Sequence, residues 1–196
     1  MKRHILISAL ISLSIPSAGS AADLEPALTS QNMPAEIQTV LGKYMTVSAA
    51  HKAISDNSDV LFIDVRNPVA IGISGHPDNI DAIVPLHIQT NKFNTFTASY
   101  ELADNPKFVE EFNSVAVIND VTKNDKIILI SDAGIDSAQA VNVLAKDGYE
   151  NIWHVVSADY GSNHVLSKRQ NLWKSAGLPW SKELVYGSEW RLMLID

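Results

Sequence analysis

Apolar runs of strand length recur through the middle of the chain. Residues 59–65 (DVLFIDV) and 125–131 (DKIILIS) are almost continuously apolar and rich in β-branched side chains. Such runs are typical of strands that are buried on both faces, as in parallel sheets. Residues 82–88 and 151–156 predict two further strands. We therefore expect a central sheet that lies inside the molecule.

An amphipathic segment follows the strand at 125–131. Residues 136–149 repeat apolar side chains at helical spacing. Asp136 is predicted to be the N-cap, with Gln139 completing a capping box. Gly148 is predicted to end the helix. Strand, loop and helix are therefore expected in immediate succession.

Two more helices are indicated by their start signals. Residues 46–54 begin at Thr46 or Ser48, either of which can act as an N-cap. Residues 105–116 begin with Asn105 as the predicted N-cap and a proline at the first helical position. Strands that alternate with helices predict an α/β fold with a central, mainly parallel sheet and helices on both faces.

Two polar stretches are harder to assign. Residues 66–79 contain proline and glycine and predict a loop with at most one helical turn. Residues 89–105 show no clear periodicity. Their aromatic side chains, Phe93, Phe96 and Tyr100, could line a binding surface, but we expect them to pack in the core.

The N-terminal segment has the features of a secretory signal peptide. Lys2 and Arg3 precede an apolar run at 5–15 that is too short to span a bilayer comfortably, and small residues follow to Ala22. We predict a signal peptide over residues 1–22. The mature protein is then expected to be soluble and exported, in the periplasm.

Composition excludes several kinds of chemistry. The chain has no cysteine, which excludes disulfides, thiolate–zinc sites, iron–sulfur clusters and cysteine nucleophiles. Removal of Lys2 and Arg3 would leave 13 of the 15 basic residues against 22 acidic ones, a net charge of about −9. Because such a chain repels polyanions, we expect neither nucleic acid nor a membrane surface as a partner.

Three motifs occur in order along the chain. The first is a strand that ends in Asp-Val-Arg and is followed by Pro and Gly-His: Asp64, Val65, Arg66, Pro68, Gly75 and His76. The second is the strand, six-residue loop, helix and strand of residues 127–155. The third is a Trp followed by Ala-Gly-Leu-Pro: Trp173, Ala176, Gly177, Leu178 and Pro179.

Together these motifs resemble the rhodanese-like domain family. The LGKY and NPKFVEEF segments are similar to those of exported single-domain rhodaneses. The resemblance implies a rhodanese-like α/β fold over residues 44–180, preceded by a lead-in segment at 23–43 and followed by a tail at 181–196. It also implies a reactive loop, in which active members carry a persulfide-forming Cys at the first position and Arg at the sixth.

The corresponding loop of this chain differs at each chemically active position. It consists of Ser131, Asp132, Ala133, Gly134, Ile135 and Asp136. A serine hydroxyl is barely ionised and carries sulfur poorly. The two carboxylates add negative charge where an anionic donor would bind. We therefore expect a degenerate member of the family that has no sulfurtransferase activity, no catalytic residue and no cofactor. Its expected role is that of a binding or accessory module for a protein or small-molecule partner that the sequence does not identify.

Several alternatives stay open. Ser131 could support residual sulfur transfer or serve as a hydrolase nucleophile, although no nucleophile-elbow motif surrounds it. Asp132 and Asp136, with Asp159 or His164, could bind a hard cation, although no ligand spacing indicates one, and we predict no metal. The simpler expectation is that Asp136 is the N-cap of the following helix and that the Asp132 carboxylate lies at the positive end of its dipole.

The remaining candidates are expected to be structural. Asp64 and Arg66 are predicted to form an internal ion pair of the fold. Four histidines are scattered along the chain and are expected to be structural or solvated: His51, His76, His87 and His154.

Export provides the first prediction. Mass spectrometry of the protein purified from its native host should find a chain that begins at or next to Asp23, because the small residues before it suit signal peptidase. A purified chain that retains Lys2 would contradict the signal peptide.

Overall fold

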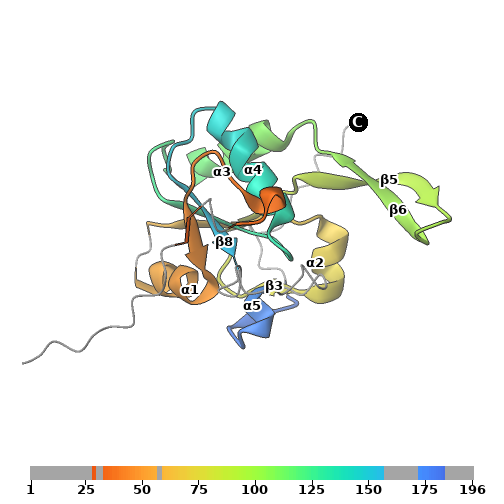
Figure 1. Ribbon diagram of the computed structural model, residues 1–196, viewed down its shortest axis with the longest axis horizontal. Helices are drawn as coiled ribbons and strands as arrows, with labels where there is room; N and C mark the ends of the chain where they lie inside the picture. Colours follow the sequence, from red (N-terminus) through yellow and green to blue (C-terminus); the bar gives the residue numbers. More distant parts are fainter. Residues whose placement is uncertain (1–27, 30–32, 57–58, 157–171, 184–196) are drawn as a thin grey trace, which may run out of the picture.

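The computed structural model describes residues 28–29, 33–56, 59–156 and 172–183 (Figure 1). Within these residues the central sheet has five strands in the order β1-β8-β7-β2-β4, and every neighbouring pair is parallel. The strands are β1 (Tyr44–Thr46), β2 (Leu61–Asp64), β4 (Ala82–Ile83), β7 (Ile127–Ile130) and β8 (Ile152–Val156). The predicted α/β fold with a mainly parallel sheet is confirmed.

Helices cover both faces of this sheet (Figure 1). One face packs against α3 (Phe108–Ile118) and α4 (Ile135–Lys146). The other packs against α1 (Val47–Asp56), α2 (Pro68–Ser74) and α5 (Leu172–Ser175). A short 3-10 turn, η2 (Ala35–Ile37), packs near α4. The result is a three-layer arrangement with the sheet in the middle.

Successive residues of the central strands serve the two layers in turn. In β2, Leu61 and Ile63 face the α3 and α4 layer, whereas Phe62 faces the opposite layer, against Trp173. All four residues of β7 are fully buried. The unbroken apolar runs in the sequence therefore reflect burial on both faces, as predicted.

Half of the segment at 66–79, which was expected to be loop with at most one helical turn, forms the seven-residue helix α2 (Pro68–Ser74). The Asn67 side chain accepts a hydrogen bond from the Ala70 N–H at 2.9 Å, and Pro68 occupies the first helical position. This pair is a strong helix start signal, which outweighs the glycines that follow. The prediction failed because it weighed the glycines more heavily than the cap.

The start signals of two other helices are only partly confirmed. Thr46 Oγ1 accepts a hydrogen bond from the Ala49 N–H at 3.2 Å, so Thr46 caps α1 as predicted. Asn105 instead accepts from the Lys107 N–H at 3.0 Å and closes a turn before α3, which begins at Phe108. The predicted N-cap at Asn105 is therefore wrong by two residues.

The region left without an assignment forms a β-hairpin, which we call the arm. It consists of β5 (His87–Asn94) and β6 (Ser99–Asp104), paired antiparallel, and it projects from the layers (Figure 1). The predicted strand at 82–88 is accordingly divided between β4 and the start of β5. Pro85, which lacks an N–H for a sheet, lies between them.

The aromatic side chains of the arm do not enter the core. Phe93, Phe96 and Tyr100 are 53%, 100% and 49% exposed. The expectation that they pack inside is wrong, because the strands that carry them extend beyond both helical layers.

The C-terminal part of the described chain closes one edge of the fold. Trp173 is fully buried, and β3 (His76–Pro77) pairs antiparallel with β9 (Trp180–Ser181). The part of the chain that the structure describes contains no helix of the length and hydrophobicity that a bilayer crossing requires.

Two glycines give a matched test of this closure. Gly75 has φ +86°, and a Cβ there would collide with the Ser181 backbone oxygen and the Trp180 indole. Gly177 has φ +70°, but a Cβ at this position would meet no other atom within 4 Å. We expect Gly75→Ala to lower the free energy of unfolding by about 3 kcal/mol or more, and Gly177→Ala by about 1 kcal/mol. Urea denaturation measures both, and equal losses would contradict the close contact at Gly75.

Candidate functional site

The predicted loop lies at the carboxyl edge of the parallel sheet. It follows β7 directly, and Ile130 at the end of β7 is in register with Asp64 at the end of β2. The segments after these two strands therefore meet, which brings Arg66 and Asp132 together. Carboxyl edges of parallel strands are where ligand sites usually form in α/β folds.

The loop is shorter than predicted, because α4 starts at Ile135. Its N-cap is Gly134, in the left-handed conformation at φ 81°, and the Ala138 N–H donates to the Gly134 carbonyl at 3.0 Å. Asp136 therefore lies within the first helical turn, and its prediction as N-cap is wrong. The positive φ at Gly134 lets the chain enter the helix two residues earlier than an N-cap at Asp136 would.

Ser131 is turned inward. It is only 2% exposed, its Oγ accepts a hydrogen bond from the Ser137 N–H at 3.2 Å, and the two hydroxyl oxygens lie 3.0 Å apart. One amide at the start of α4, which could otherwise point at a bound anion, is thus used by the protein itself.

A histidine extends this network into the core. The Ser137 Oγ lies 3.0 Å from His154 Nδ1 and 3.2 Å from the Gly134 carbonyl oxygen. If Ser137 donates to Gly134, it accepts from both Ser131 Oγ and His154 Nδ1, and both hydroxyls and this ring nitrogen have partners. His154 Nε2 has no hydrogen-bond partner within the described residues. Burial lowers the pKa of His154 to about 3, so it is neutral at pH 7.

Arg66 is the central group of the site. It is 2% exposed, and its Nε and Nη2 donate to both oxygens of Asp64 at 2.5 to 3.0 Å. Nη2 also donates to the Gly75 carbonyl, while Nη1 donates to Ser74 Oγ at 2.9 Å and to Asp132 Oδ1 at 3.0 Å. A guanidinium has five N–H donors, and each of them has a partner here.

Two carboxylates are paired with the guanidinium of Arg66. The Asp64–Arg66 ion pair predicted from the sequence is confirmed, and Asp132 is a second carboxylate on the same guanidinium. Burial lowers the pKa of Arg66, but the two carboxylates raise it above its usual value. Asp132 therefore pairs with Arg66. The indole of Trp180 lies below the guanidinium, with its centroid 5.5 Å from Cζ.

Asp136 has a different environment on the outer side of the loop. Its Oδ1 lies 3.7 Å from His87 Nδ1, and His87 Nε2 lies 3.3 Å from Asp104. Burial raises the pKa of Asp136, and Asp132 and Asp64 raise it further by repulsion.

The remaining predicted residues lie at separate positions. His76 is buried, with ring nitrogens 2.7 and 3.1 Å from the carbonyl oxygens of Pro77 and Glu183, and His51 stacks edge-on against Trp173. Both are structural, as expected. Asp159 and His164, named for a cation site, lie outside the described residues. Among the residues described, no three His, Asp or Glu side chains are grouped as a metal ion would need.

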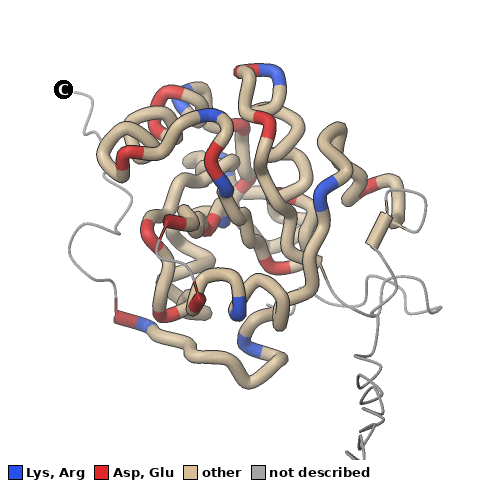
Figure 2. Tube along the Cα trace, turned by 90° about the vertical axis from the view of Figure 1, so that its left-hand side faces the viewer, with Lys and Arg blue, Asp and Glu red and all other residues tan. Residues whose placement is uncertain are grey.

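Figure 2 shows acidic and basic positions interspersed along the described trace.

The sequence analysis missed two members of the site. Ser137 and Ser74 both contribute hydroxyls, to Ser131 and Arg66 respectively. Ser137 follows the loop directly, so its position was a usable signal. Ser74 lies in a segment expected to be loop, where no contact could be predicted.

Comparisons with known proteins support the fold. No protein-family model matches the chain, and no curated protein sequence matches it. The crystal structure of Rv0390 from M. tuberculosis resembles it with a TM-score of 0.51 and 19% identity, covering 72% of this chain and 98% of the other. This likeness shows a shared fold, in agreement with the predicted rhodanese-like architecture.

Two further solved structures overlap more loosely. A rhodanese-related protein from Thermoplasma volcanium has a TM-score of 0.40 and 16% identity, over 72% of this chain and 99% of its own. A polysulfide-sulfur transferase homodimer from Wolinella succinogenes has a TM-score of 0.43 and 13% identity, over 85% of each chain.

The burial of His154 predicts an acid-sensitive fold. His154 is neutral when folded but takes up a proton below about pH 6.5 when unfolded. Its contribution to stability is therefore complete above pH 6.5 and is lost as the pH falls toward 3, by up to about 1.4 kcal/mol per unit. We expect the unfolding free energy of the wild type, relative to that of His154→Leu, to fall by up to this amount for each unit that the pH is lowered below 6.5.

Urea denaturation at several pH values between about 7 and 4 measures this difference. The raised pKa values of Asp81 and Asp136 act in the opposite direction, but both groups are present in the two proteins and largely cancel. Parallel stability curves for the two proteins would show that His154 does not titrate between the folded and unfolded states as its burial requires.

Proposed function

We propose that this chain is an exported, periplasmic rhodanese-like protein that has no sulfurtransferase activity and serves as a binding or accessory module. The observation that carries the proposal is the state of Arg66, whose five donors are all used inside the protein. The cationic group nearest the loop therefore has nothing to offer an anionic sulfur donor.

The loop lacks the means to hold a persulfide as well. Family members that transfer sulfur are expected to use a cysteine thiolate, which is both nucleophilic and able to carry sulfur. Ser131 has a hydroxyl in that place, and it is buried and bonded to Ser137. Oxygen at this position supports neither step.

Electrostatics disfavour a donor such as thiosulfate. Asp132 and Asp136 flank the loop, and each like charge within a few ångströms costs on the order of 1–4 kcal/mol at intermediate dielectric. The ion pair with Arg66 offsets Asp132, but Asp64 already neutralises that guanidinium. Three carboxylates and one guanidinium therefore leave the site with an excess of negative charge. This charge suits a neutral or cationic partner, whether protein or small molecule.

A Ser131-dependent hydrolase is the second candidate, because Ser131, Ser137 and His154 are linked by hydrogen bonds. Two features weigh against it. His154 contacts Ser137 rather than Ser131, and with a pKa of about 3 it is a weak general base. Ser131 is also too buried to meet a substrate without movement of the loop.

Restoring the nucleophile alone is expected to restore little activity. In Ser131→Cys the thiol would lie beside Asp132 and Asp136, whose charges raise its pKa and repel thiosulfate. In Ser131→Cys/Asp132→Ser/Asp136→Arg, Arg66 gains a free donor and the loop gains a second cation. We expect thiosulfate:cyanide turnover in the triple variant to exceed that of the single variant by at least about tenfold.

The control is Asp132→Ser/Asp136→Arg without the cysteine, which should remain inactive although it has the same charge. Circular dichroism checks that each variant folds, and mass spectrometry looks for one added sulfur atom. Sulfur transfer by the wild type, or full activity of Ser131→Cys alone, would overturn the proposal. Ester hydrolysis by the wild type that disappears in Ser131→Ala would favour the hydrolase instead.

A further inference from the structure

The arm exposes an apolar face that nothing in the described chain covers. Phe93 and Tyr100 are cross-strand partners with ring centroids 5.3 Å apart, and Leu102 follows on the same side of β6. Leu102 is 51% exposed, and Phe96 at the turn is fully exposed. Because side chains alternate along a strand, Phe93, Tyr100 and Leu102 share one face of the hairpin, together with Gln89, which pairs with Leu102. Phe96 adds an exposed aromatic ring in the turn at the tip.

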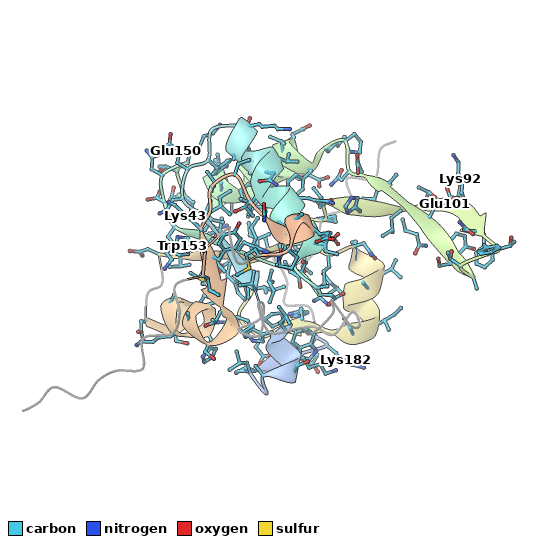
Figure 3. All side chains as sticks on the ribbon, viewed as in Figure 1. Lys43, Lys92, Glu101, Glu150, Trp153 and Lys182 are labelled. Atoms are coloured by element: carbon cyan, nitrogen blue, oxygen red, sulfur yellow. The ribbon has the colours of Figure 1, made fainter. Side chains whose placement is uncertain are left out.

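The opposite face of the arm is more polar toward its tip, where Asn94 pairs with Ser99, although Ile88 and Ala103 form an apolar pair on it near the base. Lys92 and Glu101 are each one position away from an apolar residue, and Figure 3 places both on the arm. The apolar face itself carries no charged side chain until the base of the arm, where His87 pairs with Asp104. The arm is thus amphipathic, although neither strand packs on the core.

Such an arm is poorly supported by its own contacts. A two-stranded hairpin is marginally stable in water unless another surface covers its apolar side. An aromatic side chain buries about 150–250 Å² when it is covered, so the exposed parts of Phe93, Phe96 and Tyr100 amount to about 300–500 Å². This is a large apolar area for one exposed hairpin.

We propose that the apolar face of the arm is a contact surface between two copies of this chain. Two arms packed face to face about a two-fold axis bury the same residues on each copy. The aromatic side chains then supply about 600–1,000 Å², and Leu102 and the backbone bring the total to the lower range of specific interfaces, about 1,000–1,200 Å².

The apolar face lacks the charges that oppose self-association elsewhere on the chain. The chain has a net charge of −7, which opposes self-association over most of its surface. The apolar face avoids this repulsion, because Glu101 lies on the other face and no acidic side chain lies on the apolar face before Asp104 at its base. It equally offers no charge by which a basic or acidic partner could be recognised, so a surface identical to itself fits best.

Association is tested with protein expressed from the complete coding sequence, so that any processing of the N-terminus takes place. Sedimentation velocity should show a monomer–dimer equilibrium with a Kd on the order of micromolar. Phe96→Ser should weaken it about tenfold or more. Phe96 is fully exposed, so this change leaves the monomer intact. The control, Glu101→Gln on the polar face, should leave the Kd within about twofold.

Crosslinking locates the surface independently. The chain has no cysteine, so one introduced thiol reports on its own surroundings. Leu102→Cys should form a disulfide-linked dimer under mild oxidation much faster than Glu101→Cys, its neighbour on the opposite face. The full proposal is independent of sulfurtransferase activity, since neither variant touches the loop at 131–136.

Three outcomes would overturn the inference. One is a wild type that stays monomeric at about 100 µM, near the weak limit for this interface. Another is a dimer that Phe96→Ser leaves unchanged, because a different surface then carries the contact. The third is co-sedimentation of a monomer with phosphatidylcholine vesicles that Phe96→Ser abolishes, which would assign the apolar face to a bilayer.

Discussion

The site depends on one buried guanidinium. Burying a charge is costly unless it is paired and hydrogen-bonded, and Arg66 meets this condition with two carboxylates, a hydroxyl and a carbonyl. These partners come from β2, from the C-terminal end of α2 with its capping Gly75, and from the loop after β7. One side chain thus connects three segments, and any ligand that used it would first have to break their contacts.

The same principle governs the loop itself. Loops at the start of a helix bind anions because their amides point outward without partners. Here the Ser131 hydroxyl accepts the Ser137 N–H, and Asp132 lies on the nearby cation. Oxygen atoms of Ser131 and Asp132 thus accept hydrogen bonds from donors that could otherwise bind an anion. These internal partners of Ser131 and Arg66 are the basis of the proposal that the loop does not bind an anionic sulfur donor.

Elements that show a periodic pattern of apolar residues could be predicted from the sequence, whereas contacts between residues far apart in the chain could not. The central strands follow from unbroken apolar runs, and the internal Asp64–Arg66 ion pair that was expected is present. The start of α4 was misplaced because a left-handed glycine and a capping aspartate both suit a helix start, and only the backbone decides between them. The pairing of Arg66 with Asp132 joins residues 66 positions apart, which no local pattern encodes.

The arm is attached to the fold in a way that makes it dispensable to the sheet. Leu86 and Asn105, which flank it, are already joined by a hydrogen bond from the Asn105 N–H to the Leu86 carbonyl at 2.9 Å. Its two ends therefore leave and rejoin the domain at one point. Insertions or deletions in the arm do not shift the register of the parallel strands. The length of this hairpin can therefore change over evolution while the rest of the domain keeps its shape.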